Sequence, residues 1–194
     1  MAKTTNDNDW DQWFGARLEA IESVLGPAEK IVGHASIPFD VGSDDGGAAD
    51  IINFKHHVKG VVSVTSELIG RDDQIQNDLG NYELMICHRD EDEWGAEIIS
   101  HLAYYTLRVR VNPGETMDIG EAAPEGSTIA ALLFVKYATF EVKQRKAGLL
   151  LCIGITDDEL RACRKDNREI VEKSLKAAKV YPFTDLYRSS VLEG

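Results

Sequence analysis

The sequence predicts one α+β domain with a central mixed or antiparallel β-sheet flanked by helices. Apolar residues follow a helical spacing in three segments and strand-like patterns in shorter segments between them. The strict alternation of strand and helix that a doubly wound nucleotide-binding fold requires is absent. With 194 residues, 43% of them hydrophobic, the chain can bury a single core, and no linker or repeat divides it. We therefore expect one domain over residues 1–194, with residues 1–12 as a flexible N-terminus.

The first element is expected to be a helix that begins near Asn8 or Asp9, either of which can cap it. Its apolar residues recur at three- and four-residue spacing: Trp10, Trp13, Phe14, Leu18, Ile21, Val24 and Leu25. Gly26 and Pro27 then end the helix.

Short β-like stretches follow in the first half of the chain. They are expected around His34–Val41, Ala49–Val58, Val61–Ser66 and Tyr82–Cys87. The turn-rich segment from Gly42 to Gly47 separates the first two, and the polar segment Arg71–Gly80 separates the last two.

A second helix is expected after Asp92, which can cap it, with Glu93 and Glu97 near its positive end. The buried stripe of this helix is expected to comprise Trp94, Ile98, Ile99, Leu102, Ala103 and either Tyr104 or Tyr105. The turn at Asn112-Pro113-Gly114 is expected to end it.

The second half is expected to hold four more strands, at Thr116–Ile119, Ile129–Val135, Tyr137–Val142 and Leu149–Ile155. A basic turn at Lys143–Ala147 joins the last two of these strands.

A capping box opens the last helical region. The Thr156 hydroxyl can accept from the Glu159 amide while the Glu159 carboxylate reaches back to the Thr156 amide. We expect a break near Asp166-Asn167, and Pro182 should end regular structure. The apolar face after the break is expected to consist of Ile170, Val171, Leu175 and Ala178.

Charge is distributed unevenly along the chain. The net charge is −12, and residues 1–100 hold 7 basic and 20 acidic side chains, which is a net −13. Nucleic-acid affinity arises mostly from contacts of Lys and Arg with phosphates, so this excess of acidic side chains predicts no nucleic-acid partner. It also disfavours docking on anionic lipid. The acidic half either keeps the protein soluble or faces a partner with a basic segment.

The residue patterns indicate no catalytic, metal or cofactor site. No phosphate-binding glycine loop, G-x-S-x-G elbow or H-E-x-x-H motif occurs. The first suspects for zinc would be Cys87, His88 and His101, but the first two are adjacent and would point to opposite faces of a strand. Three cysteines without a C-x-x-C pair, and a polar N-terminus without a signal-peptide core, predict free thiols and a cytoplasmic location.

The order of elements in the second half resembles the suppressor-of-fused family, particularly its short bacterial members. The resemblance covers residues 60–192, and residues 13–26 more loosely. It is carried by Tyr82-Glu83-Leu84, by the Trp94 helix with Leu102-Ala103-Tyr104-Tyr105, by Pro113-Gly114-Glu115, by residues 150–160, and by Pro182–Asp185 with Arg188–Val191.

The resemblance implies a non-catalytic domain that binds a protein or peptide partner. In animal members a second domain follows, and the two clamp a peptide that adds a strand. Two peptide-contacting positions match Tyr105 and Glu115, although the animal family has aspartate at the second. Bacterial relatives are further implied to be immunity proteins against toxins. An enzyme with an unrecognised site and a purely structural, oligomeric domain stay as alternatives.

Overall fold

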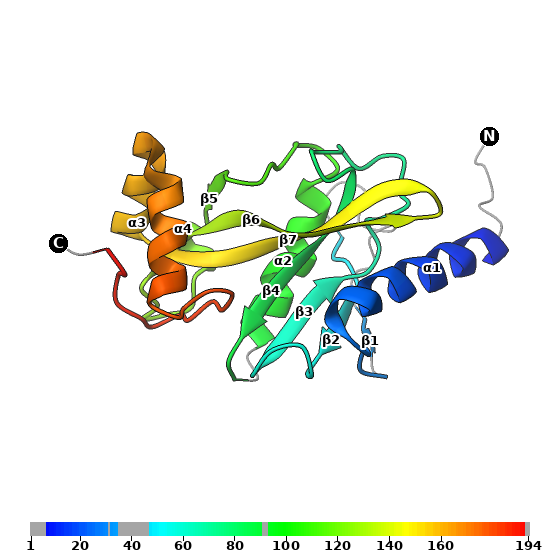
Figure 1. Cartoon of the computed structure of the whole chain (residues 1–194), viewed down its shortest axis with the longest axis horizontal. Coiled ribbons are helices and arrows are strands. Elements are labelled where there is room, and N and C mark those ends of the chain that lie inside the picture. The colour runs from blue at the N-terminus through cyan, green and yellow to red at the C-terminus, as the bar shows by residue number, and fades with distance from the viewer. Residues whose placement is uncertain (1–6, 31, 35–46, 91–92, 193–194) are drawn as a thin grey trace.

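The fold is a seven-stranded sheet with helices on both faces (Figure 1). The computed structural model describes residues 7–30, 32–34, 47–90 and 93–192. In chain order the elements are α1 (Asp7–Leu25), β1 (Val32–Gly33), β2 (Ile51–Phe54), β3 (Val61–Thr65), β4 (Asn81–His88), α2 (Glu93–Tyr105), β5 (Thr116–Asp118), β6 (Ile129–Val142), β7 (Arg145–Thr156), α3 (Asp157–Ala162) and α4 (Arg168–Ala177).

The strand order is β1-β2-β3-β4-β7-β6-β5, and β4 and β7 form the one parallel pair in the described part of the chain. The predicted α+β class with a mixed sheet is therefore confirmed. One face of the sheet packs against α1, α3 and α4, and the other packs against α2. Strands β4 and β7 lie at the centre with both faces covered, which explains why nearly every residue in them is buried.

Helix α1 begins at Asp7, so residues 7–12 are helical, and it ends where predicted. Gly26 follows in the left-handed region, at a φ of 82°, as a helix-terminating glycine does. Ile21 and Leu25 bury the sheet-facing side of the helix.

A buried ion pair also holds α1 to the sheet. The Nε atom of Arg17 lies 3.7 Å from the Glu83 carboxylate, and the Arg17 guanidinium donates to the carbonyl of Ile69 at 2.9 Å. The carboxylate accepts hydrogen bonds from the Thr65 hydroxyl and from the amides of Leu68 and Ile69. Burial raises the pKa of Glu83, while the charge of Arg17 and these three hydrogen bonds oppose the rise.

Three sequence predictions for the elements were wrong. The strands expected at Ile129–Val135 and Tyr137–Val142 are one strand, β6, whose register shifts between Lys136 and Ala138. Helix α2 ends at Tyr105, well before the turn at Asn112; turns follow it, and the Thr106 hydroxyl donates to the Ala103 carbonyl. Ile170 is 54% exposed and Ala178 is also exposed, so only Val171 and Leu175 of the expected face are buried. Of the strand expected around His34–Val41, residues 35–41 lie outside the described residues, and β1 precedes them.

The helix break was predicted correctly, whereas the hairpin turn is shorter than the predicted Lys143–Ala147, because β7 already begins at Arg145. Lys143 and Gln144 join β6 to β7 with positive φ angles of 46° and 64°, as a two-residue hairpin turn requires. Between α3 and α4 the backbone leaves helical geometry at Lys165 and Asp166.

No helix in the described ranges has the length and hydrophobicity needed to span a membrane.

The capping box at α3 is formed as predicted, with both reciprocal contacts present. The Thr156 amide donates to the Glu159 carboxylate at 3.0 Å, and the Thr156 hydroxyl donates to Asp158 at 2.6 Å.

We expect Thr156→Ala to lower the free energy of unfolding by about 1 kcal/mol, the usual cost of deleting a helix cap. Urea denaturation followed by circular dichroism should show a lower midpoint with an unchanged slope. A loss of only a few tenths of a kcal/mol would mean that the hydroxyl makes no net contribution to the cap.

Candidate partner-binding site

Tyr105 lies on the surface at the C-terminal end of α2. Its side chain is 40% exposed, whereas Leu102 and Ala103 of the same helix are buried. Tyr104 is the half-buried member of the tyrosine pair and packs against the core, with the Arg108 guanidinium 4.7 Å from its ring centroid. Of the two alternatives that the sequence left open, Tyr104 therefore belongs to the core, and Tyr105 is the exposed residue.

Glu115 closes the turn that leads into β5. Its carboxylate accepts from the Asn112 amide at 2.8 Å and from the Asn112 side chain at 2.9 Å. Its backbone carbonyl accepts from the Phe134 amide, so the residue extends the pairing of β5 with β6. Glu115 thus has a structural role, and its side chain is also exposed.

Tyr105 and Glu115 occupy the two ends of the connection between α2 and β5. Among the described residues, no hydrogen bond joins their side chains. Hydrogen bonds hold the connection itself to the domain: the Ile75 amide donates to the Thr106 carbonyl, and the Asn77 side chain donates to the Val111 carbonyl. The structure therefore keeps the two predicted residues on one segment without bringing them into contact.

Strand β5 is the edge of the sheet, beyond which no strand follows in the described part of the chain. The amide of Ile119 donates to Ala130 and the carbonyl of Glu115 accepts from Phe134, so these two residues face β6. Because the direction of backbone groups alternates along a strand, the amides of Thr116 and Asp118 face outward. An outward row of amides and carbonyls is the group of atoms that an added strand requires.

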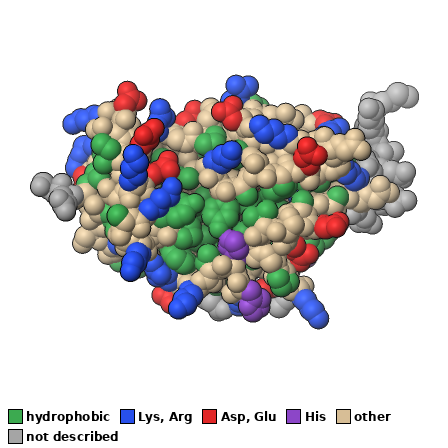
Figure 2. Space-filling model, viewed as in Figure 1, with side chains coloured by type: hydrophobic (Ala, Val, Ile, Leu, Met, Phe, Trp, Pro, Cys, Tyr) green, Lys and Arg blue, Asp and Glu red, His purple; other side chains and the backbone are tan. Residues whose placement is uncertain are grey.

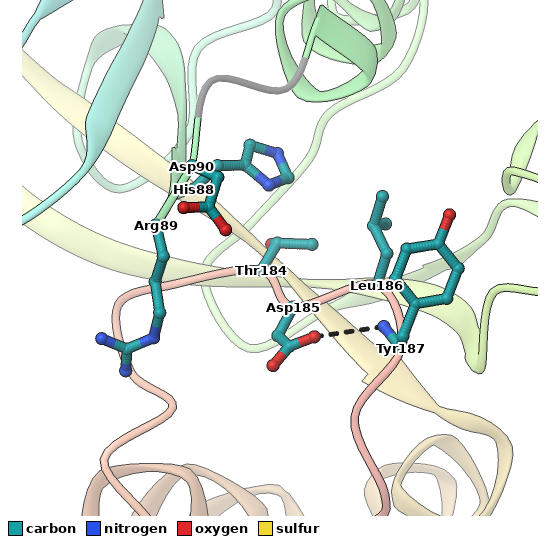
Figure 3. Close-up of a pocket in the computed structure, with 7 residues that line it drawn as sticks. All are labelled: His88, Arg89, Asp90, Thr184, Asp185, Leu186 and Tyr187. Atoms are coloured by element: carbon teal, nitrogen blue, oxygen red, sulfur yellow. Dashed lines mark hydrogen bonds between the residues drawn. The ribbon is translucent and has the colours of Figure 1, made fainter.

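A shallow pocket of about 180 Å³ lies elsewhere, at the end of β4 (Figure 3). It is lined by His88, Arg89, Asp90, Thr184, Asp185, Leu186 and Tyr187. The Tyr187 amide donates to the Asp185 carboxylate, and the Tyr187 side chain is 64% exposed. Sequence reasoning missed this pocket because its two segments lie about a hundred residues apart.

An acidic cluster, Asp90–Glu93, follows β4; Asp90 lines this pocket, and Glu91 and Asp92 lie outside the described residues. The cluster ends at Glu93, the first residue of α2, whereas Tyr105 is the last residue of that helix. Since an α-helix rises 1.5 Å per residue, about 18 Å separates the two ends. The acidic cluster and Tyr105 therefore do not form one site, and a ligand would have to run along α2 to contact both.

A buried ion pair holds the C-terminal wall of the pocket. The Arg188 guanidinium donates to both Glu159 carboxylate oxygens at 2.6 Å and to the Gly154 carbonyl at 3.0 Å. The same carboxylate accepts from the amide of Val191. Burial alone would raise the pKa of Glu159, but the hydrogen bonds and the charge of Arg188 outweigh it and hold that pKa below its usual value. Arg188 thereby ties the segment that carries Leu186 and Tyr187 to the sheet.

The suspected zinc ligands are separated in space. Cys87 points into the core on the α1 side, and His88 points toward α2, where its ring meets Trp94 edge-on at 6.2 Å. His101 is exposed on α2. Within the described ranges, no three His, Cys, Asp or Glu side chains are grouped so that they could hold a metal ion.

These features define an α+β domain in which β5 has no strand on its outer side. An exposed tyrosine ends α2, and a pocket lies at the opposite end of that helix. The model of the suppressor of fused protein (SUFU) family matches residues 50–189. The chain therefore belongs to the suppressor of fused family.

Solved structures of the family share the fold. A suppressor of fused homologue from Neisseria gonorrhoeae aligns with a TM-score of 0.66 and 17% identity, over 95% of this chain and 99% of that one. The structure of the Sufu–Fu complex aligns with a TM-score of 0.72 and 12% identity, over 92% of each chain. Drosophila Suppressor of Fused aligns with a TM-score of 0.54 and 13% identity, over 73% of this chain and 42% of that one. No curated protein matches significantly by sequence.

Proposed function

We propose that the chain is a non-catalytic protein-interaction domain whose β5 edge pairs with an extended segment of a partner, beside Tyr105 and Glu115. The observation that carries the proposal is that β5 has no strand on its outer side in the described part of the chain; the Glu115 turn leads into this strand. A relative of the same fold has been solved as the Sufu–Fu complex, which supports a protein as the ligand.

The partner segment is proposed to be basic. Residues 1–100 carry a net charge of −13, so a basic segment would be attracted before contact, and salt would screen this attraction. A toxin neutralised by this chain is the more specific form of the proposal. Its test is the growth of cells that express the candidate toxin with and without this chain.

The Tyr105→Ala variant tests the site. Loss of a desolvated aromatic anchor typically costs about 2 kcal/mol, so we expect the partner's Kd to rise about 30-fold, mainly through faster dissociation. The measurement uses the partner recovered with the tagged full chain from its native host, followed by surface plasmon resonance with the purified pair.

Two further variants make this test specific. Tyr187→Ala removes an even more exposed tyrosine near the pocket and should leave the Kd unchanged. Thr116→Pro removes an outward amide of β5 and should weaken binding with little change in Tm. A Tyr105→Ala variant with a lowered Tm and unchanged rate constants would refute the site.

A further inference from the structure

Two arginines from the region between α3 and α4 reach across to β5 (Figure 1). The Arg164 guanidinium donates to the Asp118 carboxylate at 2.7 Å, and the Arg168 guanidinium lies 3.4 Å from the Gly114 carbonyl. Gly114 has a φ of 88°, and a β-carbon at this position would meet the Arg168 side chain at 3.3 Å. The glycine therefore gives the guanidinium room to rest on the backbone, and the two arginines stand at the two ends of β5.

The two arginines differ in their counter-charges. Arg164 has an aspartate of β5, whereas no carboxylate within the described ranges forms an ion pair with Arg168. Glu172, one turn further along α4, lies 3.9 Å from the Lys176 ammonium. Glu169 directly follows Arg168 in the helix and so points about 100° away around its axis. Arg168 is exposed, and its positive charge faces solvent beside the start of β5.

The side chains of β5 alternate between the two faces of the sheet. Thr116 pairs with a β6 residue that packs on the side of α3 and α4, so it shares that face with Arg168. Glu115 precedes it and points to the opposite face, where Asn112 holds its carboxylate. A strand rises about 3.3 Å per residue, so Thr116 lies about 7 Å from Gly114, on which Arg168 rests. In an added strand, the residue directly opposite Thr116 would lie on the same face and project toward Arg168.

A carboxylate is the group that a planar guanidinium recognises most specifically, because it can accept two parallel hydrogen bonds. The position opposite Asp118 is unsuitable for an acidic residue, because Asp118 already pairs with Arg164 and would repel a second carboxylate. We infer that the segment which pairs with β5 carries an Asp or Glu opposite Thr116, bound by Arg168. This inference rests on the proposed function of the β5 edge and adds a specificity-determining residue to it.

The local charge around β5 supports an acidic residue at this position. Residues 101–194, which hold β5, α3 and α4, carry 14 basic and 13 acidic side chains, a net +1, in contrast to −13 for residues 1–100. Figure 2 shows several Lys and Arg side chains gathered over α3 and α4. The acidic first half attracts a basic segment as a whole and from a distance, whereas Arg168 acts at contact on one position. A segment with one acidic residue among basic ones satisfies both.

Three designed peptides test the inference: Ac-KTVTXTVTK-amide, labelled with a fluorophore, in which X is Glu, Gln or Lys. Because X is central and a strand can shift by two positions without changing faces, X can lie opposite Thr116 in either strand orientation. By fluorescence polarisation at low salt, we expect the Glu peptide to bind the full chain about fivefold more tightly than the Gln peptide, the upper range for an exposed ion pair. The Lys peptide should bind more weakly still, although the chain as a whole is negative. The preference should be lost at about 1 M salt, where the screening length is about 3 Å.

Variants of the full chain assign the preference to one side chain. Arg168→Gln should bind the Glu and Gln peptides equally and keep its Tm, because its hydrogen bond in the described part of the chain is the long one to Gly114. Arg161→Gln is the matched control: it removes another exposed arginine, which pairs with Asp157 on α3, and should keep the fivefold preference. Thr116→Pro should weaken the binding of all three peptides, because it removes an outward amide of β5.

The outcomes separate this inference from the proposed function. Equal affinities of the wild type for the Glu and Gln peptides, or an unchanged preference in the folded Arg168→Gln variant, would overturn the role of Arg168. If Thr116→Pro still weakened binding in that case, pairing at β5 would stand. Binding that Thr116→Pro leaves unchanged, or no binding by any of the peptides, would contradict the β5 edge itself and the inference with it.

Discussion

Arg188→Met should destabilise the domain by about 3–5 kcal/mol, because it leaves the Glu159 carboxylate buried without its counter-charge. Glu159 is fully buried, and Arg188 supplies two of its hydrogen bonds. Urea denaturation at pH 7 should show the loss as a lower midpoint. Hydrogen exchange should show earlier opening of residues 184–191, which Arg188 holds to the sheet.

The matched control is Arg161→Met. Arg161 pairs with Asp157 on the same helix, but both side chains are more than 60% exposed, so the pair should be worth less than about 0.5 kcal/mol. Equal losses in the two variants would contradict the role assigned to Arg188.

The pH dependence provides an independent test of the same pair. The pKa of Glu159 is lower in the folded protein than in the unfolded chain. The carboxylate therefore contributes its full stabilisation above the unfolded pKa of about 4.3, and this stabilisation is lost as pH falls through the lower folded pKa. The Arg188→Met variant lacks the counter-charge that lowers this pKa. The stability difference between wild type and variant should therefore shrink below about pH 4.3.

Breaking the Arg17–Glu83 pair should have a similarly large effect. Arg17→Met removes the counter-charge of the fully buried Glu83, and the expected loss is again about 3–5 kcal/mol. The measurement is a double-mutant cycle in urea with Arg17→Met, Glu83→Gln and the double variant. Because the glutamine is uncharged, the double variant should be more stable than the sum of the single losses predicts.

Strict additivity in that cycle would show that the two groups are energetically independent. Glu83→Gln alone should still lose stability, because the carboxylate accepts from Thr65 and from two backbone amides, and one amide oxygen cannot satisfy all three donors.

Only part of the candidate site could be predicted from the sequence. The resemblance singled out Tyr105 and Glu115, but both Tyr104 and Tyr105 fitted the apolar spacing of α2. Adjacent helical residues point about 100° apart, so the exposure of Tyr105 depended on which side of α2 meets the sheet. The capping box predicted the Glu159–Thr156 contact, whereas Arg188, which lies 29 positions further on, belonged to a segment that carries the resemblance, and no local pattern paired it with Glu159.

The sequence by itself determined the features that depend on neighbours a few positions apart. These are the end of α1 at Gly26, the cap at Thr156, the turn at Lys143 and Gln144, and the fold class. The tertiary structure decided the parallel pairing of β4 with β7, the burial of Arg17 on Glu83 and the pocket at His88. The physical reason is that local hydrogen bonds and dihedral preferences are set within one turn of chain, whereas contacts between distant residues depend on strand order and on which face each strand buries.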